Sequence, residues 1–593
     1  MAPNIPTASL HLSYPLYACD FDPQDANRLV VGGGGGPGRS GVSNKISVLD
    51  VSDKDSVQIL SELDLSRDED SVNTLAVGPR RRNSILVFTG INSSPADVAK
   101  GKNEHFRIFG VDQTSKAKAT PKIAELSRST LFSSKEADTY QRVLRLSHPY
   151  ADKPQIGAIA TGLAKDAEIA VFDVPSTGNA PKSRGKLELV KEAMDMDIIQ
   201  TGDSEWQIVY CDDFEIYTLS IGKRGTEGPH LVFTVPHDES PRASFRSIRY
   251  LTPTFLIATA NIPKASGVVL QGFRLPKPDQ GSDAKARLAI SAKLPKTVAR
   301  STGMAVRNLS PPSAPTTKYG DVQFVIAVAG QDSSVTLYKI DHQSVGEIEL
   351  LTNLHLINTL KEVHPGPISG LVFSHFVPPK TATMRQHYLK LASIGSMGNS
   401  CVVHSLPLRR VNEKGVPASA RRAGPPRQPR YEVALKSHGP SPRDLIMVLA
   451  AIVLLLAIIG QSVLEVKGLS PSVIGARRVL PHSWHEDWSH KSPLKEGFLS
   501  EFLAEKKLGA DDKVVVLNVD SQGDDAGVKV DTHSEETHGK AVEWHELPTE
   551  QKNAWKEKLK EAGHWGEHLG EAVFKGVLFG EIGGLVGQVV REL

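Results

Sequence analysis

The sequence is poor in the residues that build disulfide frameworks and cysteine-based metal sites. It has three cysteines in 593 residues, and Cys19, Cys211 and Cys401 lie too far apart to form either. The formal net charge at pH 7 is only +2. No global basic field therefore favours nucleic acid, and we expect no nucleic-acid partner. The first 25 residues lack a basic region followed by an apolar one, so we expect no cleavable signal peptide.

Catalytic motifs are also lacking. The sequence contains no Gly-x-Ser-x-Gly elbow, no His-Glu-x-x-His and no kinase motif set. A Gly-x-Gly-x-x-Gly pattern occurs at Gly33, Gly35 and Gly38, but a dinucleotide fingerprint must open a helix, and here a second strand follows directly. The acidic runs 68–70 and 212–213 are typical of solvated turns. We therefore expect a protein that acts by binding, without covalent chemistry.

One glycine-rich stretch stands out, between two short apolar strands at 28–31 and 45–49. Seven of the thirteen residues from Gly32 to Asn44 are glycine, and the stretch is longer than the two to five residues that usually close a hairpin. Such a loop loses much conformational entropy when it becomes ordered, so its length suggests that it has a function that offsets this cost. Two interpretations remain open: a flexible surface loop without a role, and a projecting loop that binds a partner with Val42 as the apolar residue near its tip.

The glycine run followed by Gly41-Val42-Ser43-Asn44, together with the opening strand Ser13-Tyr14-Pro15-Leu16-Tyr17, resembles a known family. It is similar to the endoplasmic-reticulum guanine-nucleotide exchange factors of the small GTPase of the COPII coat, the prolactin regulatory element-binding protein family, in a fungal type with a lumenal domain. In that family the loop binds potassium and engages the GTPase. The resemblance implies an exchange loop of Gly38, Arg39, Ser40, Gly41, Val42, Ser43 and Asn44, and a potassium site at Gly38, Ser40, Gly41 and Asn44. The five-glycine run, the valine at 42 and the insert 37–40 depart from the family pattern.

The region from Leu10 to about Leu408 is rich in short strands separated by Gly, Pro, Asp and Ser. One pattern, a strand that closes on a short polar turn, occurs seven times, at Ile46–Val51, Phe106–Val111, Glu168–Val174, Phe214–Ile221, Val268–Leu275, Val335–Ile340 and Cys401–Leu406. The spacing suits four-stranded blades with loop insertions. The pattern predicts an all-β, seven-bladed WD-type β-propeller over residues 1–408, closed by a strand at Leu10–Cys19. A β-sandwich array is the less favoured alternative.

Residues 409–444 are basic and proline-rich, which is typical of a linker. Residues 445–464 follow as an uncharged apolar run. Twenty residues at about 1.5 Å each reach about 30 Å, the thickness of the hydrocarbon core of a bilayer. This stretch is therefore predicted to be a single transmembrane helix.

The flanks of this helix indicate its orientation. Basic residues favour the N-terminal side, and all three cysteines and the sequons at Asn92 and Asn308 precede the helix. A cytosolic domain keeps thiols reduced and sequons unused, so the propeller is expected in the cytosol and residues 465–593 in the lumen. This small α+β segment is expected to contain a hairpin at 513–531, a helix at 549–562 and an interfacial or packed helix at 571–590. His482, His485 and His490 match no standard metal-ligand spacing.

Three functions compete. The first is an endoplasmic-reticulum membrane protein that activates the COPII GTPase by nucleotide exchange, with potassium as its implied ion. The second is a non-catalytic membrane-anchored scaffold or tether, which shares every feature except a role for the glycine-rich loop. The third, a lumenal metal hydrolase, rests only on scattered histidines.

Overall fold

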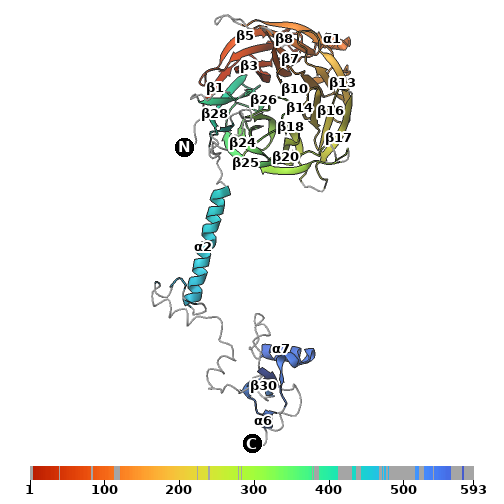
Figure 1. Ribbon diagram of the computed structural model, residues 1–593. Coiled ribbons are helices and arrows are strands. Elements are labelled where there is room, and N and C mark those ends of the chain that lie inside the picture. The colour runs from red at the N-terminus through yellow and green to blue at the C-terminus, as the bar shows by residue number, and fades with distance from the viewer. Residues whose placement is uncertain are drawn as a thin grey trace. The chain divides into compact units, whose positions relative to one another are not determined.

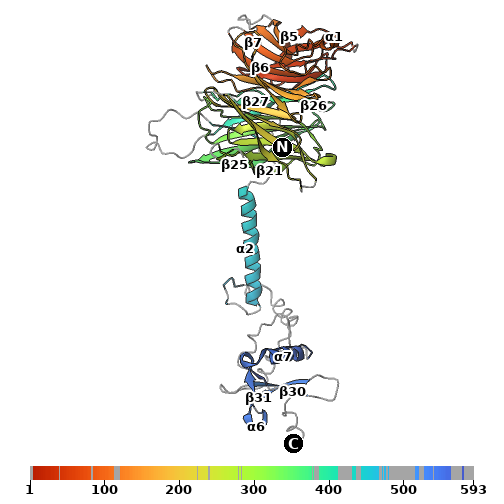
Figure 2. The same cartoon turned by 90° about the vertical axis from the view of Figure 1, so that its right-hand side faces the viewer.

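In the computed structural model, the chain divides into two compact units, residues 1–441 and 442–593. The structure describes residues 5–435, except 39–40, 82–83, 113–120, 224, 238–240, 278–279, 282–283, 377, 380–385 and 412–429. It also describes residues 442–466, 471, 473–475, 479, 514–519, 527–538, 540–561 and 577–579. Figures 1 and 2 show both units from two directions.

The described part of residues 1–441 contains seven antiparallel sheets, six of them built from four consecutive strands. The first three are β2 Leu16–Asp22, β3 Asp25–Gly33, β4 Lys45–Asp50 and β5 Gln58–Asp64; β6 Thr74–Arg81, β7 Ser84–Gly90, β8 Phe106–Asp112 and β9 Ile123–Ser129; and β10 Tyr140–Leu146, β11 Ile156–Gly162, β12 Ala167–Asp173 and β13 Lys182–Leu189. The next three are β14 Asp195–Gly202, β15 Glu205–Cys211, β16 Glu215–Ile221 and β17 Thr226–Thr234; β18 Ser244–Thr252, β19 Phe255–Asn261, β20 Val268–Arg274 and β21 Arg287–Lys293; and β22 Ser301–Asn308, β23 Val322–Gly330, β24 Val335–Val345 and β25 Ile348–Leu360.

The seventh sheet joins the two ends of this unit. It pairs β1 Thr7–His11 with β28 Ser400–Arg410, next to β27 His387–Gly395 and β26 Ile368–Phe373. The predicted closure between the N-terminal strand and the last sheet is thus confirmed, but the bounds of that strand were wrong. The stretch Leu10–Cys19 is split by a bend at Ser13-Tyr14, so β1 closes the last sheet and β2 opens the first.

The seven sheets form a ring (Figure 1). Their first strands contact one another in sequence, from β2 through β6, β10, β14, β18 and β22 to β26, and β26 contacts β2 again. The seven strands predicted from the repeating pattern are β4, β8, β12, β16, β20, β24 and β28, the third strand of each sheet. The sequence repeat therefore corresponds to a real structural unit.

The hydrophobic core of the ring lies between adjacent sheets. One cluster, for example, joins Val30 and Val48 of the first sheet to Leu75, Val87 and Phe109 of the second. In the second sheet, the second strand β7 and the third strand β8 are buried at six of their seven residues, whereas the fourth strand β9 alternates half-buried with exposed residues. Inside the ring the first strands line a cavity of about 330 Å³.

The ring unit extends beyond the predicted boundary at residue 408. β28 continues to Arg410, and β29 Tyr431–Val433 pairs antiparallel with its end. Tyr431, Val433 and Leu435 are buried in the core cluster of the last two sheets. The basic composition of 409–444 indicated a linker, but these apolar residues near its C-terminal end return the chain to the sheet. The segment that connects the ring to the next helix therefore begins only after residue 435.

The described helices of the ring unit are short: α1 Pro95–Ala99 is capped by Ser94, and the 3₁₀ turn η1 spans Pro263–Ala265. The second unit begins with α2 Pro442–Val466. Within it, Ile446–Glu465 is long and apolar enough, by length and composition, to cross a membrane. It is the one such helix in the described part of the chain.

The C-terminal segment is a small α+β assembly. Its sheet has the order β31-β30-β33-β32, from Gly527–Thr532, Val514–Val519, Val577–Phe579 and Val542–Glu543, with α6 Glu535–His538, η4 Trp544–Glu546 and α7 Thr549–Glu561. The hairpin and the helix at 549 are confirmed. The prediction of a helix at 571–590 is wrong for the three residues of that range that the structure describes. Residues 577–579 form β33, which is parallel to β30 and buries Leu578 and Phe579. His482, His485 and His490 lie outside the described residues.

Candidate functional site

The glycine-rich stretch connects β3 to β4, the second and third strands of the first sheet. Its first glycines are fixed by close packing. A Cβ on Gly33 would lie 1.9 Å from the carbonyl oxygen of Pro15, and one on Gly32 would lie 2.7 Å from Val72. A larger side chain would force the backbone to move at Gly33 and the Val72 side chain to move at Gly32. This part of the stretch belongs to the ring.

Asn44 closes the base of the loop from the other side. Its side chain is fully buried, and its Oδ1 accepts a hydrogen bond of 2.9 Å from the backbone N–H of Gly36. Its Nδ2 donates to the carbonyl oxygens of Ser66 (3.0 Å) and Glu69 (2.8 Å). We call this set of three hydrogen bonds the Asn44 clamp. It ties both ends of the loop to the segment between the first and second sheets.

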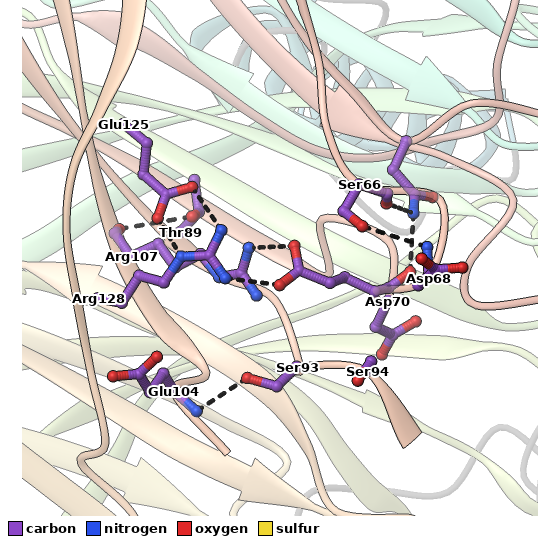
Figure 3. A network of polar contacts seen from close by, with 12 residues as sticks. Ser66, Asp68, Asp70, Thr89, Ser93, Ser94, Glu104, Arg107, Glu125 and Arg128 are labelled. Atoms are coloured by element: carbon purple, nitrogen blue, oxygen red, sulfur yellow. Dashed lines mark hydrogen bonds and ion pairs between the residues drawn. The ribbon is translucent and has the colours of Figure 1, made fainter. Parts of the chain in front are cut away.

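The segment that receives the clamp is itself held by a buried ion network. Glu69 lies 2.6 Å from Arg107, which is fully buried, and 2.6 Å from Arg128, which also pairs with Glu125 (Figure 3). Burial alone would raise the pKa of Glu69, but the hydrogen bonds from the two guanidinium groups outweigh it and lower that pKa. Glu69 is thus ionised at neutral pH and fixes the backbone to which Asn44 is bonded.

The tip of the loop differs from its base. Pro37, Gly38 and Gly41 are exposed, and a Cβ on Gly38 or Gly41 would meet no atom within 4 Å. Gly41 has φ +74°, a conformation that glycine adopts without strain. The seven glycines therefore serve two purposes: those at the base allow close packing, and those at the tip leave the backbone open to an approaching surface.

The predicted site residues fall into three groups. Gly38 and Gly41 lie at the open tip, and Asn44 lies in the buried base. Val42 and Ser43 are half-buried, and Val42 packs against the core cluster between the first and last sheets, so it is less exposed than a residue at a projecting tip. Arg39 and Ser40 lie outside the described residues.

The acidic run 68–70 was interpreted from the sequence as a solvated turn, and that interpretation missed its contribution. Glu69 is buried in the ion network, and Asp70 accepts hydrogen bonds from Ser71 N and Asn73 Nδ2 next to the loop. Tyr17 on β2 is 38% exposed; partial burial raises the pKa of its hydroxyl, and the charge of Asp70 raises it further.

The cavity inside the ring is the main alternative site. Two of the arginines that line it, Arg145 (3.1 Å) and Arg249, pair with the buried Asp195. Burial raises the pKa of Asp20 to about 6, although its carboxylate accepts hydrogen bonds from Val77 N and Phe21 N. Such pairs join neighbouring first strands, so we assign them to ring stability. Among the described residues of both units, no three His, Cys, Asp or Glu side chains form a group that could hold a metal ion.

Together these features define an all-β ring of four-stranded sheets with one rigidly based, open-tipped loop and one apolar helix. No family model matches the chain. Over 142 residues it is 34% identical to the guanine nucleotide-exchange factor SEC12 of Candida glabrata, a match that covers 23% of this chain and 28% of the relative. The matched region thus spans about a quarter of the length of that curated protein.

The chain is also similar, at low sequence identity, to several solved structures. They include Sqt1 of Saccharomyces cerevisiae (TM-score 0.40, 9% identity, 69% of this chain and 100% of that chain) and Sqt1 of Chaetomium thermophilum (0.39, 16%, 66% and 83%). The WD40 domain of Toxoplasma gondii coronin is similar at TM-score 0.35 and 12% identity, over 68% of this chain and 87% of the other. All of these scores are below 0.5, and the strand pairing of the chain itself defines the fold.

Proposed function

We propose that the chain is a membrane-anchored guanine-nucleotide exchange factor for the small GTPase that initiates COPII budding from the endoplasmic reticulum. The seven sheets would be the blades of a seven-bladed propeller in the cytosol, α2 would cross the membrane, and residues 465–593 would lie in the lumen. The observation that carries the proposal is a loop with a clamped base and an open tip, in a chain that is similar in part to a SEC12 exchange factor.

The loop would act by binding. Exchange requires a surface that binds the nucleotide-free GTPase more tightly than the nucleotide-bound form. A rigid base reduces the entropy that the loop loses on docking, since the clamp has already ordered it. The glycines at the tip, Gly38 and Gly41, let the backbone approach the nucleotide-binding region closely. No covalent step is involved, so the protein is not an enzyme in the chemical sense.

Potassium would order the tip. The proposed ligands are Gly38, Ser40, Gly41 and Asn44. Asn44 could contribute an oxygen ligand from the base of the loop, because its carboxamide oxygen accepts one hydrogen bond, from Gly36, and a carbonyl oxygen has a second lone pair. Exchange should be faster in potassium than in sodium or lithium at equal ionic strength, which must be fixed because screening changes association rates. Equal rates in the three salts would remove the ion from the proposal.

The buried state of Asn92 supports a cytosolic ring. Its Nδ2 donates to the carbonyl oxygen of Thr139, and its Oδ1 accepts from Asn103 and Gln141, so this sequon is not available for glycosylation in the folded ring. In sealed microsomes, external protease should remove the ring and leave a protected fragment that begins near α2. Protection of the ring would overturn the orientation.

The exchange activity is tested by release of a fluorescent guanine nucleotide from the COPII GTPase in the presence of the full chain in proteoliposomes. Acceleration at catalytic amounts supports the proposal. Binding of the GTPase without acceleration would favour the scaffold function instead.

A further inference from the structure

The hairpin of β24 and β25 extends past the sheet to which it belongs. The neighbouring strand β23 begins at Val322, opposite His342, so the residues of β24 beyond His342 pair only with β25. In this extension Gln343 lies opposite Leu350, and Val345 lies opposite Ile348. The tip is therefore a two-stranded projection that no third strand of this sheet covers.

The two faces of the projection differ. Val345, Ile348 and Leu350 share one face, and they are 69%, 58% and 44% exposed. On the other face Glu349 accepts a hydrogen bond of 2.5 Å from Thr254 of the preceding sheet, and Leu351 packs against the core. The hairpin is thus held in place by one face and presents three aliphatic side chains on the other.

The ring topology fixes the end at which this hairpin projects. Equivalent strands of successive sheets run in the same direction, so β24 and β28, both third strands, end at the same side of the ring. β29 pairs with the last residues of β28, and Val433 N donates to Gln323 at the start of β23. The chain therefore leaves the ring at the end where the hairpin projects. Six residues separate Leu435 from the first residue of α2, Pro442, and the seven Cα–Cα steps between them span at most about 25 Å.

We propose that the apolar face of this hairpin tip contacts the lipid surface of the membrane in which α2 is anchored. The inference rests on the membrane anchoring proposed above and is independent of nucleotide exchange. Single exposed aliphatic residues are common on protein surfaces, but here three of them lie together at the end of the ring that the short connection holds near the bilayer. The contact is shallow, because Glu347 in the turn is exposed and a carboxylate is costly below the headgroups.

The contact would orient the ring. Arg410 is exposed at the same end and is placed to meet anionic headgroups, and Arg409 beside it is also exposed but pairs with Glu432 (3.3 Å). The β3–β4 loop connects a second strand to a third strand, so it lies at the opposite end of the ring, as does every equivalent loop. A hairpin on the lipid surface therefore turns the candidate exchange loop away from the membrane, toward a partner that arrives from solution.

The test uses the full chain in proteoliposomes with an environment-sensitive fluorophore at one introduced cysteine. The probe position is Ile348→Cys. The matched control is Val190→Cys, which replaces a fully exposed aliphatic residue just after the fourth strand β13 and hence at the opposite end. Val453→Cys in α2 reports on anchoring itself. The native Cys211 and Cys401 are buried and Cys19 is half-buried, so labelling favours the introduced thiol.

The proposal predicts that the fluorescence emission of the label at 348 is blue-shifted relative to that of the label at 190. Spin-labelled lipid should also quench the label at 348 several-fold more than the label at 190. Leu350→Glu should reduce that quenching, and Val190→Glu should not change it. Equal quenching at 348 and 190 would overturn the proposal while the label at 453 still confirms anchoring. A blue shift at 348 without lipid quenching would assign the hairpin to a protein contact, and loss of quenching at 453 would overturn the anchoring as well.

Discussion

The Asn44 clamp gives the sharpest prediction about how the loop is built. Asn44→Ala removes three side-chain hydrogen bonds and leaves the N–H of Gly36 and the carbonyl oxygens of Ser66 and Glu69 without that partner. At about 1 kcal/mol for each hydrogen bond, the local free energy of opening should fall by about 3 kcal/mol. Since about 1.4 kcal/mol corresponds to a tenfold change, amide hydrogen exchange of the loop base should accelerate about 100-fold.

The assay is hydrogen exchange measured by mass spectrometry on peptides that cover 32–44 and 65–70. Asn44→Asp is the informative second variant. It keeps the oxygen that accepts from Gly36 but turns a carboxylate toward two carbonyl oxygens, so it should open the base at least as much as alanine does. Asn179→Ala, at an exposed loop position, serves as the control and should leave both peptides unchanged. If amide hydrogen exchange in the loop of Asn44→Ala were as slow as in the wild type, the clamp would be refuted.

Three further predictions follow from the loop and the core. Gly33→Ala should lower the melting temperature because its Cβ would meet the carbonyl oxygen of Pro15, whereas Gly38→Ala should leave it unchanged because its Cβ meets open space; equal melting temperatures would contradict this. Val42→Asp should slow nucleotide release and also lower the melting temperature, since Val42 packs on the core; an unchanged melting temperature would show that the contact is weak. Burial lowers the pKa of His105 to about 4, and its Nε2 accepts from two backbone N–H groups. Because the unfolded state takes up the proton first, the stability of the ring should fall as the pH drops from about 6.5 to about 4, by up to about 1.4 kcal/mol per pH unit for this group. His105→Gln should flatten the pH dependence of the free energy of unfolding, measured by chemical denaturation. An unchanged pH dependence would contradict the assignment to His105.

The repeating architecture was predictable because its signal is local. Each third strand is a run of alternating or apolar residues closed by a polar turn, and five of the seven were predicted to within one residue of their observed bounds; β24 and β28 continue five and four residues beyond their predicted ends. The role of Asn44 was not predictable, because its partners lie 22 and 25 residues away and are backbone carbonyl groups, which leave no mark on the sequence. β29 was missed for a related reason. Only its position against β28 turns three residues of a basic, proline-rich stretch into a strand.

The candidate site was predicted in outline and changed in detail. The length of the loop and its glycines drew attention to the right place, but the sequence could not separate base from tip. That separation depends on what each missing Cβ would meet, which is Pro15 at Gly33 and open space at Gly38. Val42 was expected to be the apolar residue of a projecting tip, but in the ring it packs against the core cluster between the first and last sheets.

The central claim is that the tip of the β3–β4 loop promotes nucleotide exchange on a GTPase. Gly38→Glu tests it most directly, because the new side chain enters open space and leaves the Asn44 clamp intact. Release of a fluorescent guanine nucleotide from the COPII GTPase should be accelerated by the wild-type chain in proteoliposomes. The variant should lose most of that acceleration, with unchanged hydrogen exchange at the loop base. Equal acceleration by both proteins, or none by the wild type, would contradict the account.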